Sequence, residues 1–394
     1  MTFNSVKQLD LADQAVFLRL DLNVPLKDGQ ITDATRIEKS IPTIKQVLQQ
    51  TNKLVIASHL GRPKGKYNRA MSLEPVAKML AKLLNIEVAL VQDYAQAPVD
   101  QLLKQLGKNR IILLENLRFH NMESENNKAF AKNLAKGLDY YVNDAFGCMH
   151  RDHASIVELA KEFKPQKRSI GFLVEKELQA LGALQQSPKT PFTVIVGGAK
   201  VSDKIGLLLN LINKCNNLLI GGGMAYTFLA YQGKKIGSSL FEPGMERMLD
   251  AIYRTAEAKK VEICLPTDHV CAATLSSDQT QIFEDQIPQD FAGFDVGPKT
   301  IAAYKQKISA SNSIFWNGPL GVFERKPFAQ GTLEIAQSIA ESSCFSVAGG
   351  GDSIAAINQA QLAAEFSHIS TGGGASLMFL EGKTLPGLKV LTGE

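Results

Sequence analysis

The sequence predicts an α/β protein built from two doubly wound parallel-sheet domains that are joined by a helical hinge. Short apolar strands alternate with segments of helical periodicity along most of the chain. The 394 residues suffice for two domains, and a composition of 45% hydrophobic and 21% charged residues can bury sizeable cores. The residues that follow the strands change near the middle of the chain, from arginine and histidine to glycine clusters. We therefore expect two units of related architecture with different ligand chemistry.

The first half of the chain contains the first series of strands and helices. A helix is expected from Thr35 toward Val47, and Leu73–Leu84 and Ala129–Lys136 also have helical periodicity. This alternation is typical of a parallel sheet with helices on its faces. The expected strands are Ala15–Leu20, Leu54–Ser58, Ile111–Leu114 and Tyr140–Asn143.

A helix expected at Leu173–Leu184 separates this series from a second one. We place the domain boundary near residue 171 and expect a Rossmann-like fold on each side of it. Ligands of such sheets bind beyond the carboxyl ends of the strands, where the unusual residues of this chain occur. The strands expected in the second half are Phe192–Val196, Leu218–Ile220, Glu262–Leu265, Ile314–Trp316, Phe345–Ala348 and Ile369–Ser370.

Composition also bears on location and on metal content. No basic segment followed by an apolar run begins the chain, and no stretch reaches the roughly 18 apolar residues of a membrane helix. We therefore expect a cytoplasmic protein without a membrane partner. The five cysteines are an odd number without a CxxC pair, which favours reduced thiols. Cys148, His150 and His153 come closest to a metal cluster, but a fourth ligand is missing.

Positive charge is concentrated in the first part of the chain. Residues 1–170 hold 25 Lys and Arg against 18 Asp and Glu, whereas the remainder holds 18 against 21. The arginines of the first part stand singly at strand ends, without runs of basic residues and with few aromatic residues between them. This distribution favours a concave pocket for a small anion, so we expect no nucleic-acid partner.

The first strand carries a row of polar side chains. Side chains alternate along a strand, so Arg19, Asp21 and Asn23 share one side with Phe17. A polar row is costly to bury unless its groups are paired. One interpretation is a salt bridge between Arg19 and Asp21, and the other is that Asp21 and Asn23 hydrogen-bond a hydroxylated ligand. Both can hold together.

Arg36 is placed unfavourably at the expected start of a helix. Thr35-Arg36-Ile37-Glu38 has the spacing of a capping box, and a cation at this end of the helix dipole costs about 0.3–1 kcal/mol. The arginine is either solvated or offset by a bound anion. Arg62, Arg118 and Arg151 also follow strands and favour the anion site, whereas His59 and His150 are better explained as hydrogen-bonded polar residues than as bases.

The glycine clusters of the second half predict phosphate binding. Lys200 and Lys204 are one helical turn apart after Gly197-Gly198, at an expected helix N-terminus. Backbone N–H groups at such a position bind phosphate, and a polyphosphate would offset the repulsion between the two lysines. The alternative is a pair of exposed lysines without a ligand.

Asp352 in Gly351-Asp352-Ser353 has two interpretations. It is either a helix N-cap or a carboxylate that holds Mg²⁺ through a ligand phosphate. Neither the G-x-x-x-x-G-K-[ST] loop nor G-x-G-x-x-G occurs at these turns, which excludes a P-loop and a dinucleotide fingerprint.

These motifs, taken together and in order, closely resemble one family, phosphoglycerate kinase. The resemblance extends from the N-terminus to Ser370-Thr371-Gly372-Gly373-Gly374-Ala375-Ser376 and so covers nearly the whole chain. The blocks that carry it are Arg19-Leu20-Asp21-Leu22-Asn23-Val24-Pro25, Ser58-His59-Leu60-Gly61-Arg62-Pro63, Glu115-Asn116-Leu117-Arg118-Phe119, Gly197-Gly198-Ala199-Lys200-Val201-Ser202-Asp203-Lys204, Trp316-Asn317-Gly318-Pro319-Leu320-Gly321-Val322-Phe323-Glu324 and Gly349-Gly350-Gly351-Asp352-Ser353.

The resemblance implies transfer of a phosphoryl group between 1,3-bisphosphoglycerate and ADP, with Mg²⁺, to give 3-phosphoglycerate and ATP. It implies catalytic roles for Arg36, Lys200, Gly350 and Gly373, and a metal contact for Asp352. The phosphoglycerate side would consist of Asp21, Asn23, Arg36, His59, Leu60, Gly61, Arg62, Arg118 and Arg151. The nucleotide side would consist of Lys200, Lys204, Gly293, Asn317, Glu324, Gly350, Gly351, Asp352 and Ser353.

The resemblance also implies domain closure, a monomer, and a tail of residues 380–394 that returns from the C-terminal domain (171–379) to the N-terminal domain (1–170). One departure is Cys148-Met149, where the family usually has smaller residues; a change in packing behind Arg151 is expected there. The alternatives are a non-catalytic nucleotide-sensing protein on the same fold and an unrelated acyl-phosphate kinase. Loss of Arg36, Lys200 or Asp352 would favour the sensor, and all three are present.

Overall fold

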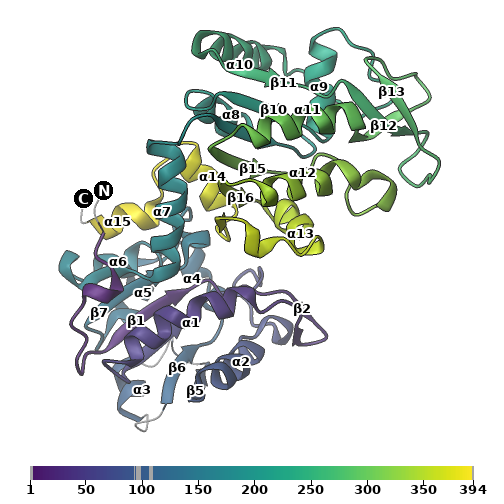
Figure 1. Ribbon diagram of the computed structural model, residues 1–394. Coiled ribbons are helices and arrows are strands. Elements are labelled where there is room, and N and C mark those ends of the chain that lie inside the picture. Colours follow the sequence, from purple (N-terminus) through teal and green to yellow (C-terminus); the bar gives the residue numbers. More distant parts are fainter. Residues whose placement is uncertain (1–2, 93, 95–98, 106–109, 393–394) are drawn as a thin grey trace. The chain divides into compact units, whose positions relative to one another are not determined.

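The computed structural model describes residues 3–92, 94, 99–105 and 110–392. The chain divides into two compact units (Figure 1). Unit 1 comprises Met1–Gln179 together with Thr384–Glu394, and unit 2 comprises Ala180–Lys383. Each unit contains a six-stranded parallel sheet, so the predicted fold class of two α/β domains is confirmed.

The sheet of unit 1 has the strand order β5-β6-β4-β1-β7-β8, and all its strands are parallel. The chain builds outward from β1 through β4 and then continues on the opposite side of β1 with β7 and β8. The carboxyl ends of β1, β4 and β7 therefore lie at a point where the strand order reverses, which is the usual ligand position in such sheets. The bounds are β1 Val16–Leu20, β4 Leu54–Ala57, β5 Glu87–Val91, β6 Arg110–Leu114, β7 Tyr140–Asp144 and β8 Arg168–Ile170.

The two faces of β1 have different surroundings, as the alternation predicts. Val16, Leu18 and Leu20 belong to a buried cluster with side chains of α1 (Thr35–Leu48) and α2 (Glu74–Leu84). On the other face, Phe17 stacks on Tyr141 of β7 with ring centroids 6.0 Å apart. Arg19 shares this second face, and the sheet thus presents its polar row away from the main aliphatic cluster.

Shorter elements complete unit 1. The C-terminal helix α15 (Pro386–Thr392) contacts α6 and β8, and the Gly387 N–H donates to the carbonyl of Met149 at 2.9 Å. Arg168 of β8 donates from Nη1 to the carbonyl of Val390 at 2.7 Å. The remaining elements are η1 Val6–Gln8, β2 Leu26–Lys27, β3 Gln30–Ile31, η2 Arg69–Met71, α3 Val99–Gln105, η3 Leu117–Phe119, α4 Asn121–Ser124, α5 Lys128–Ala135, η4 Phe146–Cys148, α6 Glu158–Lys161 and η5 Pro165–Lys167.

Helix α7 (Phe172–Gln186) contains the predicted helix Leu173–Leu184 and crosses the border between the two units at Gln179. The buried Asp144 at the end of β7 holds its first turn, because its Oδ1 accepts from the N–H groups of Leu173 (2.8 Å) and Val174 (3.0 Å). Burial raises the pKa of Asp144 to about 6, against the effect of these hydrogen bonds.

The main sheet of unit 2 has the order β11-β10-β9-β15-β16-β17 and is also parallel. Trp316 of β15 is fully buried in a cluster formed with α11, α12 and α13. The strands are β9 Phe192–Val196, β10 Asn217–Ile220, β11 Glu262–Cys264, β15 Ser313–Asn317, β16 Phe345–Gly349 and β17 His368–Ile369. The helices are α8 Ile205–Leu211, α9 Gly223–Tyr231, α10 Glu246–Lys259, α11 Pro298–Ser309, α12 Gln330–Glu341, α13 Gly351–Gln359 and α14 Gly374–Leu380, with η6 Lys326–Phe328 and η7 Ala363–Glu365.

Unit 2 also contains a small antiparallel sheet that the sequence did not predict. It has the order β13-β12-β14 and consists of Gln281–Glu284, Asp268–Ala272 and Ala292–Val296. Two of these strands carry a buried aspartate, Asp268 and Asp295, and Gln281–Glu284 is largely exposed. Such segments lack the apolar run that marks a strand of a covered parallel sheet.

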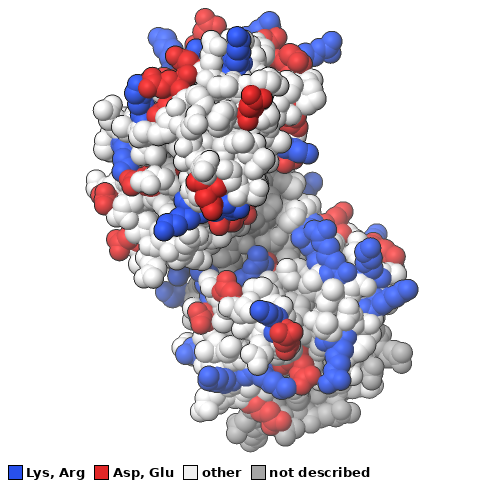
Figure 2. Space-filling view, turned by 90° about the vertical axis from the view of Figure 1, so that its right-hand side faces the viewer, with Lys and Arg blue, Asp and Glu red and all other residues white. Residues whose placement is uncertain are grey.

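Charged side chains are distributed over both units. Figure 2 shows Lys and Arg in separate groups on one face, with Asp and Glu among them. Within the described part of the chain, none of the helices is both long enough and apolar enough to cross a bilayer.

Arg168→Ala should destabilise unit 1 by about 1–3 kcal/mol, because buried carbonyls lose a charged donor. In the wild type, Arg168 donates to the carbonyls of Phe163 and Val390, each at 2.7 Å. Urea unfolding followed by hydrogen exchange of unit 1 amides measures this loss, and the fluorescence of Trp316 follows unit 2 separately. Arg69→Ala, at an exposed position, is the control. Equal stability of the two variants would contradict the role given to Arg168.

Candidate active site

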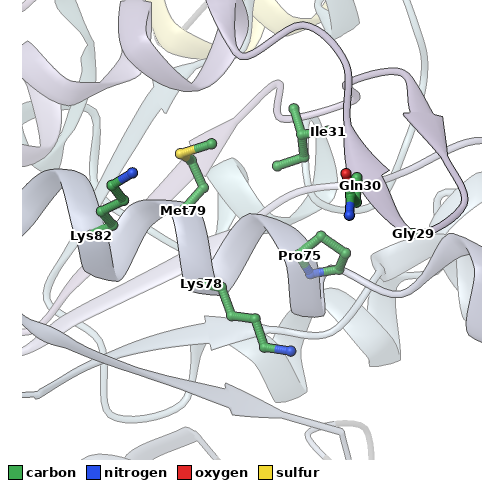
Figure 3. Close-up of a pocket in the computed structure, with 7 residues that line it drawn as sticks. All are labelled: Gly29, Gln30, Ile31, Pro75, Lys78, Met79 and Lys82. Carbon is green, nitrogen blue, oxygen red and sulfur yellow. The ribbon is translucent and has the colours of Figure 1, made fainter.

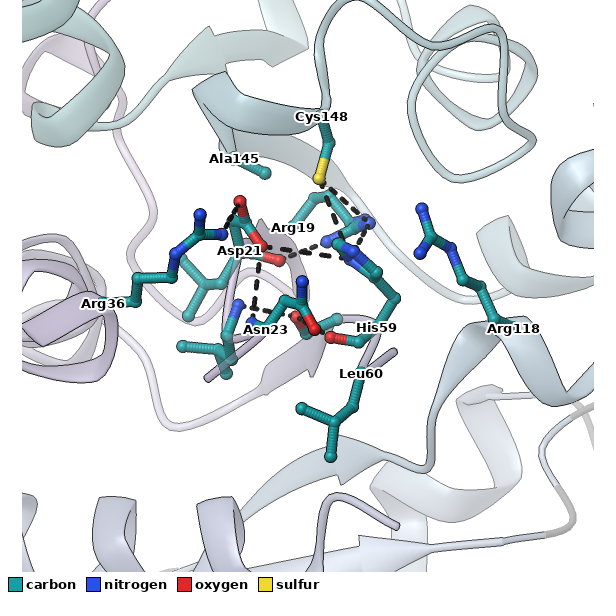
Figure 4. Close-up of polar contacts among 12 residues, drawn as sticks. Arg19, Asp21, Asn23, Arg36, His59, Leu60, Arg118, Ala145 and Cys148 are labelled. Carbon is teal, nitrogen blue, oxygen red and sulfur yellow. Dashed lines mark hydrogen bonds and ion pairs between the residues drawn. The ribbon is translucent and has the colours of Figure 1, made fainter. Parts of the chain in front are cut away.

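The carboxyl edge of the first sheet gathers most of the predicted phosphoglycerate residues (Figure 4). Asp21 follows β1 directly and forms an ion pair with Arg36. The Oδ1 of Asn23 accepts from the N–H of Gly61 at 2.8 Å. The interpretation of a salt bridge between Arg19 and Asp21 is therefore wrong. Arg36 from α1 forms the ion pair with the Asp21 carboxylate, and Arg19 contacts other groups.

Arg36 is the second residue of α1, as expected, but the predicted capping box is wrong. The N-cap is Ala34, without a side-chain hydrogen bond, and Thr35 is already helical. The loop before the helix supplies a different acceptor, since Oδ1 of Asp33 accepts from the Thr35 N–H at 2.8 Å. The unfavourable position of the Arg36 cation is offset by Asp21, and about a third of the Arg36 side chain (34%) stays exposed.

His59 lies at the centre of this group and is almost fully buried. Its Nδ1 lies 3.4 Å from Nη2 of Arg19, 4.0 Å from Oδ1 of Asp21 and 3.8 Å from Sγ of Cys148. Burial lowers the pKa of His59 well below its ordinary value, and the neighbouring Arg19 and Arg151 lower it further. The ring is therefore neutral near pH 7 and acts as a hydrogen-bonding group.

Two further arginines lie near His59. Arg118 is buried in η3, where its Nη1 donates to the carbonyl of Gly61 at 2.7 Å. Arg151 donates from Nε to Nε2 of His150 at 3.4 Å. Burial lowers the pKa of Arg151, and among its charged neighbours Asp21 opposes this effect while Arg62, Arg19 and Arg36 add to it. Arg62, Arg19, Arg36 and Arg151 therefore lie close enough for their charges to act on one another. The Arg62 side chain is exposed.

Asn116 organises two of these loops. Its Oδ1 accepts from the N–H groups of Leu60 and Arg118, each at 3.1 Å, and its Nδ2 donates to the carbonyl of Leu60 at 2.7 Å. The side chain is fully buried. Asn116 belongs to the Glu115–Phe119 motif, but no role was predicted for it; the local signal is an amide two residues after a strand.

One group of possible metal ligands occurs among the described residues, formed by Asp21, His59 and Cys148, with ligand atoms within 4.8 Å of one another. Arg36 already pairs with Asp21, and Nη2 of Arg19 lies 3.8 Å from the sulfur. Burial raises the pKa of Cys148 to about 12, so the thiol stays protonated. The environment opposes a cation and favours an anion. Cys148 contacts Arg19 and His59. The change in packing behind Arg151 stays a prediction.

In unit 2, Lys204 and Asn317 of the predicted nucleotide group are hydrogen-bonded to each other; Asn317 is fully buried and Lys204 is partly buried. Lys204 donates from Nζ to Oδ1 of Asn317, and Asn317 donates from Nδ2 to the carbonyl of Gly349 at 2.7 Å. Burial lowers the pKa of Lys204, against the opposing charges of Asp203 and Asp352. Helix α8 begins only at Ile205, so the prediction that Lys200 and Lys204 share one helical turn is wrong. Lys200 is exposed in the preceding turn.

The glycine loops after β9, β10 and β15 are joined backbone to backbone. The Gly198 N–H donates to the carbonyl of Pro319 at 3.1 Å, and the Gly222 N–H donates to that of Leu320 at 2.9 Å. Gly222 has φ +66°, and a Cβ there would lie 2.6 Å from the nitrogen of Gly198. Any other residue at position 222 would force these loops apart.

The loop after β16 begins helix α13. Gly350 is its N-cap with φ +93°, Gly351 is its first residue, and Asp352 is its exposed second residue. The N-cap interpretation of Asp352 is therefore wrong, since the cap lies two residues earlier. Ser353 accepts at Oγ from the Gly318 N–H at 2.6 Å, which joins this loop to the loop after β15.

Three predicted residues share no hydrogen bond with the Lys204–Asn317 group in the described structure. Gly293 lies in β14, where its N–H donates to Oγ of Ser239 at 2.9 Å. Glu324 is exposed after β15, and Gly373 is the N-cap of α14 with φ +53°. Asn317 of the predicted nucleotide side is thus hydrogen-bonded to Lys204, whereas no hydrogen bond joins Gly293, Glu324 or Gly373 to this pair among the described residues.

A separate surface groove of about 370 Å³ lies between the β2–β3 hairpin and α2 (Figure 3). None of the predicted site residues lines it. The lining residues are Gly29, Gln30, Ile31, Pro75, Lys78, Met79 and Lys82.

Comparison with known proteins gives a consistent result. Residues 6–383 match the family model described as Phosphoglycerate kinase. Phosphoglycerate kinase of Anaeromyxobacter sp. (strain Fw109-5) is 46% identical over 100% of both chains, and that of Acidobacterium capsulatum is 48% identical over 98% of both. The structure of phosphoglycerate kinase from Coxiella burnetii superposes with a TM-score of 0.91 at 41% identity, covering 100% of this chain and 99% of that one.

His153→Gln should make the stability of unit 1 less sensitive to acid. Burial, followed by the charges of Arg19 and Arg151, lowers the pKa of His153 from 6.5 to about 4. The unfolded chain takes up a proton below 6.5 and the folded protein does not, so stability falls as the pH falls. Between pH 7 and 5 this histidine alone removes about 2 kcal/mol. Hydrogen exchange of unit 1 amides at pH 7 and at pH 5 measures this loss of stability in wild type and in His153→Gln. An identical pH dependence in the two proteins would refute the lowered pKa of His153.

Proposed function

Because the chain belongs to the phosphoglycerate kinase family, we propose that it reversibly transfers the acyl phosphate of 1,3-bisphosphoglycerate to Mg-ADP, giving 3-phosphoglycerate and ATP. Family membership makes the protein a phosphotransferase. The observation that carries the more specific proposal is the gathering of Asp21, Asn23, Arg36, His59 and Arg118 at one edge of the first sheet. We place this activity in glycolysis, in a cytoplasmic monomer.

Unit 1 would bind phosphoglycerate. A small anion with several charges suits clustered guanidinium groups, which contact carboxylate and phosphate oxygens in pairs. Arg62 and Arg151 have exposed or partly exposed side chains, and Arg36 has a third of its surface free. Asp21 and Asn23 would hold the hydroxyl group, with the neutral His59 ring as a further hydrogen-bond partner and Leu60 and Gly61 contributing backbone.

Unit 2 would bind the nucleotide. The start of α13 offers free backbone N–H groups at Gly351, Asp352 and Ser353, and Gly350 gives them access because it has no side chain. Lys204 and the exposed Lys200 would contact phosphate oxygens. Gly293, Asn317 and Glu324 would contact the adenosine.

The residues around Asp352 fit a magnesium ion that comes with the nucleotide. Asp352 is an exposed carboxylate at the start of α13, and its charge reaches Lys204 in the same group of loops. Proteins often hold Mg²⁺ through one or two carboxylates together with substrate phosphates. Asp352 would provide that carboxylate, and the ion would neutralise charge on the phosphate oxygens.

The mechanism is direct in-line transfer. The attacking or leaving group of phosphoglycerate is a carboxylate, so no proton has to be removed. The lowered pKa of His59 makes it a poor base, in line with this mechanism. Arg36 would exchange its contact with Asp21 for the oxygens of the moving phosphoryl group, while Lys200 and the backbone of Gly350 and Gly373 act from the nucleotide side. Direct transfer and exclusion of water require closure of the two units during the reaction.

An assay that couples ATP-dependent consumption of 3-phosphoglycerate to NADH oxidation tests the proposal. Activity that requires ATP, Mg²⁺ and 3-phosphoglycerate together would support it. A purified, folded protein that binds nucleotide but produces no 1,3-bisphosphoglycerate would overturn it in favour of a sensing role.

Arg36→Ala should lower kcat by about 10³, with much smaller changes in either KM, because its proposed contact strengthens in the transition state. Arg36→Lys should recover only part of this loss, since a single ammonium replaces the two-pronged guanidinium. Steady-state kinetics with thermal melts as a folding control decide the matter. A large rise in KM at near-normal kcat would show that Arg36 serves ground-state binding only.

Asp352→Asn should remove the gain in ATP affinity that Mg²⁺ confers, because an amide is a poor ligand for a hard cation. Its effect on stability should stay below about 1 kcal/mol, the scale of a helix-dipole contribution at an exposed position. Isothermal titration with ATP in Mg²⁺ and in EDTA measures this without turnover. If magnesium strengthens ATP binding equally in both proteins, Asp352 is not the metal contact.

A further inference from the structure

Arg19 is a fully buried cation at the centre of unit 1. Its Nε donates to Oγ of Ser155 at 2.8 Å, another nitrogen donates to the carbonyl of Leu20, and Nη2 lies 3.4 Å from Nδ1 of His59. The hydrogen-bond partners found for Arg19 are thus neutral groups. A buried charge needs compensation from nearby, and the identity of its counter-charge decides how its neighbours are arranged.

Glu123 supplies that charge through Ser155. Its Oε1 accepts from the Ser155 hydroxyl at 2.6 Å and its Oε2 accepts from the Ser155 N–H at 2.9 Å. The carboxyl group is fully buried. Burial raises the pKa of Glu123, while the charge of Arg19 lowers it, which is the mark of two opposite charges facing each other across the hydroxyl.

This chain of contacts also joins three parts of the candidate site. Glu123 belongs to α4, which follows the η3 turn that carries Arg118. Ser155 follows the loop of Arg151, and the neighbouring Ala154 N–H donates to the carbonyl of Glu123 at 2.8 Å. Arg19 extends the chain to β1 and His59. One buried carboxylate therefore connects the segments after β1, β6 and β7.

We propose that Glu123, acting through Ser155, is a positioning residue for the phosphoglycerate site. Because Glu123 is the counter-charge of Arg19, Asp21 stays paired with Arg36. Without it, Asp21 becomes the counter-charge of Arg19, since His59 Nδ1 lies 3.4 Å from Arg19 and 4.0 Å from Asp21. Asp21 would then leave Arg36 and the ligand hydroxyl. This inference rests on the proposed function and adds to it a residue that touches no substrate.

The simpler explanation is that Glu123 only holds the segment of Ser155 against α4. Asp268 offers a matched control for that role, because it is equally buried and accepts from the Thr300 hydroxyl at 2.6 Å and from the Lys299 N–H at 2.9 Å. It belongs to β12 of unit 2, and no arginine is among its hydrogen-bond partners in the described chain. A structural role predicts the same kind of loss from both residues.

The experiment compares wild type with Glu123→Gln, Ser155→Ala, the double variant and Asp268→Asn. Isothermal titration gives the Kd for 3-phosphoglycerate and for ATP, well below each melting temperature, and steady-state kinetics give kcat. Glu123→Gln keeps the shape, removes the charge and replaces one of the two accepting oxygens by an NH2 group, so one of the bonds from Ser155 is also lost. We expect it to weaken 3-phosphoglycerate binding about tenfold, the scale of a lost charged hydrogen-bond partner. Its ATP affinity and its kcat at saturation should change less than about twofold, a split that a general loss of stability does not produce.

Ser155→Ala should weaken 3-phosphoglycerate binding similarly, and the double variant should be no weaker than either single variant, because both act through one chain of contacts. Asp268→Asn should lower the melting temperature without changing this Kd. The inference is overturned if Glu123→Gln binds 3-phosphoglycerate like wild type, or if Asp268→Asn weakens it equally. Should Glu123→Gln not fold, unchanged binding in Ser155→Ala overturns it. Wild type that binds no 3-phosphoglycerate would instead overturn the proposed function.

Discussion

The parallel pairing of β1 with both β4 and β7 is the constraint on which the site depends. In this register Arg19 lies opposite Ala57 on one side and Asn143 on the other. The three strands therefore end at the same level, and the residues that follow them, Asp21, His59 and the loop before Arg151, meet at one edge of the sheet. Arg19 of β1 reaches both His59 and Ser155 there. Strand register thus sets which charges become neighbours.

The two anion sites that we propose are built in different ways. Unit 1 uses side chains, whose charges must be balanced while the site is empty, as the Asp21–Arg36 ion pair shows. Unit 2 uses backbone around glycine, where the loops hold one another through N–H groups and carbonyls, together with the charged side chains of Lys200, Lys204 and Asp352. A charged site needs a surrounding network of counter-charges, whereas a backbone site needs close approach.

Much of this architecture could be predicted from the sequence. Most strands of the two parallel sheets are apolar runs, so β1, β4, β7, β9 and β15 could be predicted from the pattern of apolar residues. Strands β5 and β8 of the first sheet were not predicted. The antiparallel sheet of unit 2 was not predicted, because its strands contain buried aspartates such as Asp268. At the site, the residue types at strand ends indicated the ligand chemistry, but the ion-pair partners of these residues could not be predicted. Asp21 pairs with a residue on a helix rather than with its neighbour on the strand, and such choices arise only from tertiary packing.

Helix α15 belongs to unit 1, although it follows all of unit 2 in the sequence. Unit 2 is therefore an insertion within unit 1, and its residues 180–383 are complete before the ribosome has made the last helix. During synthesis the carbonyl of Val390 reaches Arg168 only after all of unit 2 has been made. The unit that appears first in the sequence is thus the last to be finished, and a chain truncated near its C-terminus would carry an intact unit 2 beside an incomplete unit 1.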